Sequence, residues 1–289
     1  MSSQAAAQLW DNLWQNYRQR VNYAQVYEQM ITEARGTVAN DHIAFRSLRL
    51  TANGTNLGIP YLARIVEKLG YEVAGEYQFP DQHLYAQHFR HPEQDQLDLP
   101  KLFISELLVE ELPENIADLI AQTVTTDACF PDVASLELNQ LARVFSRPWD
   151  APRHSVIETV NSVSQYGAWV LLHGYAVNHF TGYVNRQNTS RYPDIESTIA
   201  GLVERQVPMK AAIEGSYGSG LRQTATQAVK EQVTVRDDAT GELIQIPWTY
   251  AYYEIAERNS IEVAPGRKQL FEAFLGPQAK NLFEMTRRQ

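Results

Sequence analysis

The chain has 289 residues and a formal net charge of -9, so its acidic surface argues against nucleic acid as a partner. Its single cysteine, Cys129, excludes an intrachain disulfide and suits a reducing compartment. The sequence has neither a basic and apolar leader at its first residues nor an uninterrupted apolar run of about 18 residues, so we expect no secretory signal, no membrane partner and a cytoplasmic location.

Periodic apolar residues and turn signals predict helices and strands along the whole chain. The first helix has an apolar stripe at helical spacing, made of Leu9, Trp10, Leu13, Trp14, Tyr17 and Val21. A later helix is predicted where Pro60 suits a first turn and Gly70 can end it. In chain order the predicted elements are helix 9–21, strand 42–50, helix 60–69, strands 71–79, 83–89 and 101–109, helices 111–125, 135–145 and 153–172, strand 177–185, helix 193–207, a hairpin at 232–247 and a strand at 249–258.

These elements do not alternate as they would in a parallel α/β sheet. The order predicts an α+β fold, in which helices pack outside a curved, mostly antiparallel sheet of the half-barrel type. We expect a single catalytic domain over residues 1–289. A helical insertion at about 111–172 separates two strands that each carry a histidine.

Three of the predicted strands carry residues that suit a metal site. In an extended segment residues 42, 44 and 46 point to one side, so His42 and Arg46 share a face. His179 occupies an equivalent place, since both histidines follow an Asn or Asp and precede an apolar residue. Glu254 lies among aromatic and aliphatic residues, where a buried carboxylate needs a partner. A metal ion would be such a partner.

Two imidazoles and one carboxylate on one side of an ion leave the opposite coordination positions open. This donor set is typical of non-haem Fe(II) oxygenases, and the single cysteine excludes zinc–thiolate chemistry. A plainer interpretation stays open, in which the histidines are hydrogen-bonded core residues and Glu254 pairs with Arg258. The other histidines of the strand region, His83, His88 and His91, are interpreted as surface residues.

Further candidates are polar residues that could bind a substrate. Arg46 suits a carboxylate, because guanidinium forms two parallel charge-assisted hydrogen bonds; a structural ion pair with a nearby acid is the less favoured alternative. The glycine-rich stretch at 215–224 lacks the Gly-Lys-Ser/Thr ending of a P-loop. Within it, Gln223 is a candidate for the pocket and Arg222 for a second anion contact; a plain turn with a surface arginine is the alternative.

Several segments resemble a known family. HIAFRSL, VNHFTGY and YYEIAER look like the metal-bearing strands of the vicinal oxygen chelate superfamily, and the last is similar to the carboxylate-bearing strand of 4-hydroxyphenylpyruvate dioxygenases. ANDHIAFRSL, LPKLFISELLVEELP, VNHFTG and GLRQTAT resemble stretches of the 2-oxoadipate dioxygenase/decarboxylase family, also called hydroxyglutarate synthases. Together they span about residues 40 to 258, in the order that the family has.

The resemblance implies an Fe(II)-dependent enzyme that converts 2-oxoadipate and O2 to 2-hydroxyglutarate and CO2 in lysine catabolism. His42, His179 and Glu254 match the family's metal ligands, and Arg46 matches an arginine that holds the substrate. The expected partners are therefore a small 2-oxo dicarboxylic acid and O2. Two alternatives remain: another metal-dependent enzyme of this fold, such as a ring-opening dioxygenase, an isomerase or a lyase, and a binding protein without catalysis.

Overall fold

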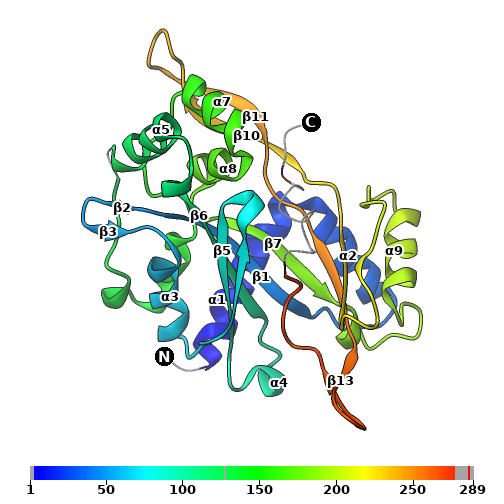
Figure 1. Cartoon of the computed structure of the whole chain (residues 1–289). Helices are drawn as coiled ribbons and strands as arrows, with labels where there is room; N and C mark the ends of the chain where they lie inside the picture. The colour runs from blue at the N-terminus through cyan, green and yellow to red at the C-terminus, as the bar shows by residue number, and fades with distance from the viewer. Residues whose placement is uncertain (1–2, 127, 277–285, 287–289) are drawn as a thin grey trace.

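The computed structural model of the chain describes residues 3–126, 128–276 and 286 (Figure 1). The α-helices are α1 (Ser3–Arg20), α2 (Asn22–Glu33), α3 (Ile59–Lys68), α4 (Gln94–Leu97), α5 (Glu114–Thr125), α6 (Leu138–Leu141), α7 (His154–Val163), α8 (Gln165–His173) and α9 (Ile195–Glu204). The strands are β1 (Asn40–Arg49), β2 (Thr51–Ala52), β3 (Thr55–Asn56), β4 (Glu72–Phe79), β5 (Leu84–Arg90), β6 (Lys101–Leu108), β7 (Val177–Tyr183), β8 (Glu214–Gly215), β9 (Leu221–Ala225), β10 (Lys230–Arg236), β11 (Leu243–Thr249), β12 (Glu254–Arg258), β13 (Ser260–Ala264) and β14 (Arg267–Leu270).

The central sheet consists of two similar halves that meet at β1 and β7. Its order is β4-β5-β6-β1-β7-β12-β9-β8. From β1 outward the pairing is parallel to β6 and then antiparallel to β5 and β4; from β7 outward it is parallel to β12 and then antiparallel to β9 and β8. β1 and β7 pair antiparallel. The sheet is thus mixed but mostly antiparallel, and the predicted α+β class is confirmed.

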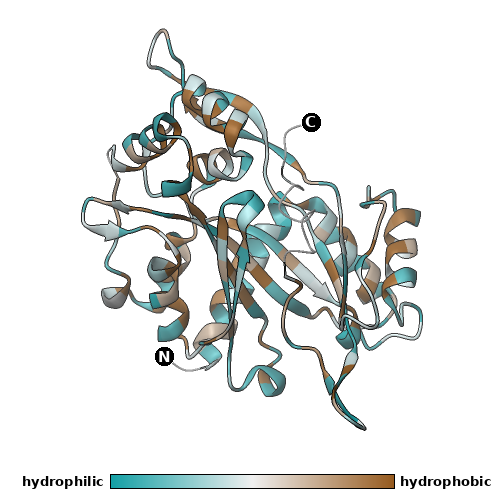
Figure 2. Cartoon of the chain, viewed as in Figure 1, coloured by the Kyte–Doolittle hydropathy of each residue, from teal (hydrophilic) through white to brown (hydrophobic). Residues whose placement is uncertain are grey.

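Strand residues alternate between two covered faces, because successive side chains of a strand point to opposite sides. The helices α1 and α2 lie behind the sheet (Figure 1), where Trp14 packs edge-on against Phe180 of β7 with ring centroids 5.2 Å apart. Tyr253 packs on the same side, 4.9 Å from the ring of Tyr27. Figure 2 shows hydrophobic residues along the central strands and on helices beside them. His179, next to Phe180, therefore faces the other side, and the strand register places His42 and Glu254 on that side as well.

Three predicted elements differ in the structure. The helix predicted at 153–172 is two helices, because Ser164 has an extended backbone and its side chain accepts the N–H of Gly167 to begin α8. The helix predicted at 135–145 is limited to α6 and one 3-10 turn (Ala142–Val144). The strand predicted at 249–258 begins only at Glu254, since residues 250–253 leave the ladder.

The segment between β6 and β7 contains α5, α6, α7 and α8, as the sequence predicts for about 111–172. Its status as an insertion, and the single catalytic domain, stay predictions. Within the described residues, no helix combines the length and the apolar character needed to cross a bilayer.

Candidate metal centre

The structure brings His42, His179 and Glu254 together, although they come from three separate strands. Each offers a ligand atom, and these atoms all lie within 4.8 Å of one another. The Nε2 atoms of the two histidines are 3.4 Å apart, and Glu254 lies 3.4 Å from His42 and 3.7 Å from His179. Such spacing leaves room for one ion between an imidazole pair and a carboxylate.

The environment of the Glu254 carboxylate is the strongest indication that the site binds a cation. The Glu254 side chain is 0% exposed, and neither carboxylate oxygen has a hydrogen-bond partner among the described residues. Burial raises the pKa of this carboxyl well above its usual range, with a further contribution from Glu214. An unpaired buried carboxylate is costly, so the residues present fit a bound cation.

Both histidines are oriented by the residue that precedes them. His42 Nδ1 lies 2.7 Å from the Asp41 carboxylate, and His179 Nδ1 lies 3.0 Å from the amide oxygen of Asn178. With Nδ1 donating to these acceptors, each Nε2 keeps a lone pair for an ion held between the three ligands, and Thr181 Oγ1 also lies 3.1 Å from His42 Nε2. Burial lowers the pKa of both imidazoles, more strongly for His179, which favours the neutral form that binds metals.

Arg258 pairs with Asp41 and not with Glu254. Its Nε and Nη2 donate to the two Asp41 oxygens at 2.5 and 2.9 Å, and all of these atoms are buried. The pKa of Asp41 is held well below its usual range: burial opposes this, but the Arg258 and Lys101 charges outweigh it. The alternative in which Glu254 is neutralised by Arg258 is therefore wrong.

Asn178→Ala is expected to weaken metal binding about 10- to 100-fold, because His179 loses the acceptor that fixes its ring. Titration with Co(II), whose visible spectrum reports its ligands, measures this change. Asn185→Ala is the matched control, since Asn185 is hydrogen-bonded to the backbone of Arg258 and does not contact either histidine through a described hydrogen bond. Equal affinities in the two variants would contradict the orienting role of Asn178.

The three residues open onto one cavity that is mostly apolar. Tyr252 stacks on His179 at 4.8 Å, and Phe274 meets His42 edge-on at 4.7 Å. The lining residues are His42, Ala44, Phe45, Arg46, Phe79, Phe103, Ser105, Asn178, His179, Gln223, Tyr252, Glu254, Phe274 and Leu275. A cavity of this kind suits a small organic acid with few polar groups.

Two of the three predicted substrate-binding residues line this cavity. Arg46 and Gln223 are both buried there. The Arg46 guanidinium lies over the rings of Tyr166 and Trp169, 4.7 and 5.0 Å from their centroids. Its Nη1 also donates to Thr286 Oγ1 at 2.9 Å.

Arg222 is placed elsewhere and does not line the cavity. It neighbours Gln223 on β9, so its side chain points to the opposite face. There it forms an ion pair with Glu196 and lies 3.5 Å from Glu257. The structure therefore gives no support to Arg222 as a substrate contact.

Several site residues were not found from the sequence. Phe274 and Leu275 come from a segment without strand or helix, where no local pattern indicates a pocket. His88, on β5, and His91, just after it, are buried and not on the surface, and His91 packs edge-on against Tyr71. The alternating pattern of LYAQHFR gives a signal for His88, whose Nδ1 lies 2.9 Å from the hydroxyl of Tyr77.

Phe103 has a special position that only the strand register reveals. His42 pairs with Thr181 and Ala44 with His179, so the two histidines occupy equivalent places in the two halves. Glu254 then lies beside Thr181, and Phe103 lies beside Ala44. Phe103 is thus the counterpart of Glu254, and the first half offers one candidate ligand where the second half offers two.

The fold is that of the glyoxalase, or vicinal oxygen chelate, class. A protein from Ralstonia eutropha JMP134 described as a glyoxalase superfamily protein is 22% identical, with a TM-score of 0.79 over 94% of this chain and 86% of that chain. The hydroxyglutarate synthase of Oryza sativa, whose crystal structure is a complex with 2-oxoadipate, is 25% identical, with a TM-score of 0.82 over 98% of this chain and 93% of that chain.

The model of the 2-oxoadipate dioxygenase/decarboxylase family matches residues 5–288, so the chain belongs to that family. The chloroplastic enzyme of that name from Arabidopsis thaliana is 29% identical over 229 residues, which are 75% of this chain and 58% of that protein. The chloroplastic/amyloplastic one from Oryza sativa subsp. japonica is 32% identical over 151 residues, 50% of this chain and 39% of that protein. The chain thus matches only 58% and 39% of the lengths of these two relatives. The resemblance of its motifs to this family is confirmed.

Proposed function

We propose that this chain is an Fe(II)-dependent dioxygenase that decarboxylates 2-oxoadipate to 2-hydroxyglutarate. The observation that carries the proposal is the buried, unpaired Glu254 carboxylate beside two imidazoles that open onto one cavity. His42, His179 and Glu254 are the proposed metal ligands. When bound, Fe(II) supplies the open coordination positions and the electron chemistry that O2 requires.

The remaining residues of the cavity bind and orient the substrate. We assign the far carboxylate of a dicarboxylic 2-oxo acid to Arg46, because this guanidinium lines a cavity whose other walls are largely apolar. Gln223 is proposed to donate a hydrogen bond to an oxygen of the same molecule. Phe79, Phe103 and Leu275 exclude water and hold the carbon chain in place.

The reaction balances without a separate reductant. One 2-oxoadipate and one O2 give one 2-hydroxyglutarate and one CO2: the bond between the carboxylate and the 2-oxo carbon breaks, one oxygen atom completes the new carboxylate and the other becomes the hydroxyl group. The names of the family and of the plant relatives, and the 2-oxoadipate in the Oryza sativa complex, support this substrate.

An oxygen electrode tests the proposal directly. The protein, loaded with Fe(II) without air, is mixed with a series of 2-oxo acids of different length. We expect the fastest O2 uptake with 2-oxoadipate and one CO2 released per O2. An isomerase or a lyase would consume no O2, and a binding protein would consume neither O2 nor 2-oxoadipate. Either result would refute the proposal.

Arg46→Lys is expected to raise KM for 2-oxoadipate about 10- to 100-fold, because a lysine cannot replace the two-pronged contact of a guanidinium. Metal affinity should change much less. Arg222→Lys is the matched control, since Arg222 pairs with Glu196 outside the cavity. Steady-state kinetics and a Co(II) titration of both variants measure the two quantities. Equal losses of metal affinity and substrate affinity in Arg46→Lys would contradict the role proposed for Arg46.

A role in lysine catabolism and a cytoplasmic location stay predictions.

A further inference from the structure

The segment after β14 covers the cavity. We call residues 271–275 the C-terminal strap; it has no regular secondary structure. In Figure 1 the dark-red chain that leaves the β13–β14 hairpin runs across the sheet face opposite α1 and α2. Among the cavity residues, Phe274 and Leu275 lie on the strap and Tyr252 lies just before β12, whereas the others lie on strands. Sheet strands cannot move apart without breaking their ladders, so the strap is the wall that can yield.

Charged side chains fasten the strap to the sheet. Lys101, at the start of β6, forms a 2.8 Å salt bridge with Glu272. Arg258 donates through Nη1 to the carbonyl oxygens of Phe271 and Ala273, at 2.9 and 2.7 Å. The same guanidinium binds Asp41, which orients His42. The strap and a proposed metal ligand thus share one buried arginine.

Aromatic contacts seat the strap over the metal site. Phe274 packs against Phe103 with ring centroids 5.0 Å apart, in addition to its edge-on contact with His42. Its N–H donates to the hydroxyl of Tyr77 at 3.0 Å. Within the described residues, the hydrogen bonds of the strap backbone beyond Phe271 all run to side chains. The strap is therefore held tightly enough to close the site, but none of the described strands pairs with it beyond Phe271.

The glycine-rich loop supports both ends of the strap. A Cβ atom on Gly220 would lie 2.4 Å from Cβ of Phe271. One on Gly215 would first meet the carbonyl oxygen of Leu221, at 1.9 Å, and would lie 3.2 Å from Leu275. Both glycines have positive φ, +82° and +79°, which other residues rarely adopt. Gly220 thus leaves the room that Phe271 occupies at the start of the strap.

We propose that the C-terminal strap is a closing wall of the active site, that Glu272 is its latch through Lys101, and that Phe274 closes over the bound 2-oxo acid. The part that concerns the substrate rests on the proposed function. Glu272 is a positioning residue, since it acts through the strap, and opening of the strap admits the substrate to a metal site that is otherwise buried.

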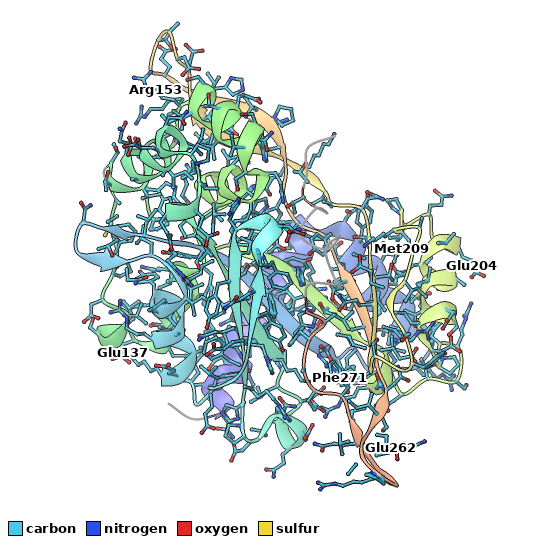
Figure 3. The ribbon with its side chains drawn as sticks, in the orientation of Figure 1. Glu137, Arg153, Glu204, Met209, Glu262 and Phe271 are labelled. Carbon is cyan, nitrogen blue, oxygen red and sulfur yellow. The ribbon has the colours of Figure 1, made fainter. Side chains whose placement is uncertain are left out.

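Hydrogen–deuterium exchange of the full chain tests the latch without any ligand. In Glu272→Gln, exchange of a peptide covering residues 268–276 should be about tenfold faster, because the lost salt bridge makes local opening easier. Glu262→Gln is the matched control: Glu262 is on β13 of the same hairpin, and Figure 3 shows it out on the projecting part. Equal exchange in both variants would overturn the latch.

A second variant removes the same bridge from the sheet side. Lys101→Met should also accelerate exchange of the strap, but less than Glu272→Gln does, because Glu272 also lies 3.8 Å from Arg90 and accepts from Gln94 Nε2 at 3.4 Å. The double variant with Glu272→Gln should exchange no faster than Glu272→Gln alone, because the bridge to Lys101 is already lost in that variant. Additive effects would show that Glu272 acts through another partner and would overturn the assignment of Lys101.

The role in substrate binding has its own measurements. In the Fe(II)-loaded wild type, kept free of O2, 2-oxoadipate should slow exchange of the strap severalfold, and Glu272→Gln should raise KM more than it lowers kcat. Unchanged exchange at a 2-oxoadipate concentration that saturates O2 uptake would overturn the closing wall. Absence of O2 uptake with every 2-oxo acid would instead refute the proposed function, while exchange without ligand still decides whether Glu272 latches the strap.

Discussion

Glu254→Gln is expected to stabilise the metal-free protein and to weaken metal binding. The substitution replaces a buried carboxylate, which has no hydrogen-bond partner among the described residues, by a neutral group of the same shape. The free energy of unfolding without metal should therefore rise by about 1–3 kcal/mol. Metal affinity should fall roughly a hundredfold to a thousandfold, because the proposed site loses its only anionic ligand. Chemical denaturation and Co(II) titration measure the two effects.

The matched control for this prediction is Glu257→Gln on the same strand. Glu257 accepts the N–H of Ile195 at the start of α9, at 2.9 Å, and lies near Arg222. Its carboxylate is paired, so the substitution should lower stability with or without metal and leave metal affinity unchanged. A Glu254→Gln protein that is less stable without metal would show that the carboxylate has a partner in the metal-free fold, contrary to the site described above.

Phe103→Glu is expected to tighten metal binding and to lower O2 uptake at least a hundredfold. Phe103 is the counterpart of Glu254 in the other half of the sheet, and it lines the same cavity. A glutamate there would offer a fourth protein ligand. Metal sites closed by four protein ligands are typically structural, whereas catalytic sites keep a position open. Metal titration measures the expected gain in metal affinity, and the oxygen electrode measures the expected loss of O2 uptake.

Phe103→Leu separates the loss of the ring from the gain of a carboxylate. Leucine keeps the wall apolar, so this control should retain metal affinity and most of the O2 uptake, with the moderate cost of a smaller side chain. If Phe103→Glu kept full activity, the position equivalent to Glu254 would not face the open side of the metal, and the symmetry of the two halves would have no chemical meaning.

The candidate site could be predicted from the sequence because its residues lie on short strands with a two-residue period. The same parity places His42, Ala44 and Arg46 on one face, and Tyr252 beside His179 while Tyr253 packs against the helices. Parity also separates Gln223 from its neighbour Arg222, but only once the face of β9 is known. A single strand does not reveal which of its faces is the inner one, so both residues were candidates.

The rest of the site depends on contacts that are distant in sequence. Parallel pairing of β1 with β6 and of β7 with β12 follows from how the two halves assemble, and no local pattern indicates it. The strap carries no periodic signal. No pattern marks its partner Lys101, and the sequence suggests Arg258 only as a possible partner of Glu254. The break between α7 and α8 at Ser164 also depends partly on tertiary packing, since every residue of α8 from Tyr166 to His173 is buried.

The junction of β1 and β7 has a consequence for the folding of the chain. One proposed ligand lies on β1 in the first half, and the other two lie on β7 and β12 in the second half. A bound ion would therefore tie together two halves whose strands pair directly over few residues. Neither half alone could then retain the metal, and part of the free energy of metal binding would stabilise the contact between the two halves. The metal would thus stabilise the fold as well as take part in the reaction.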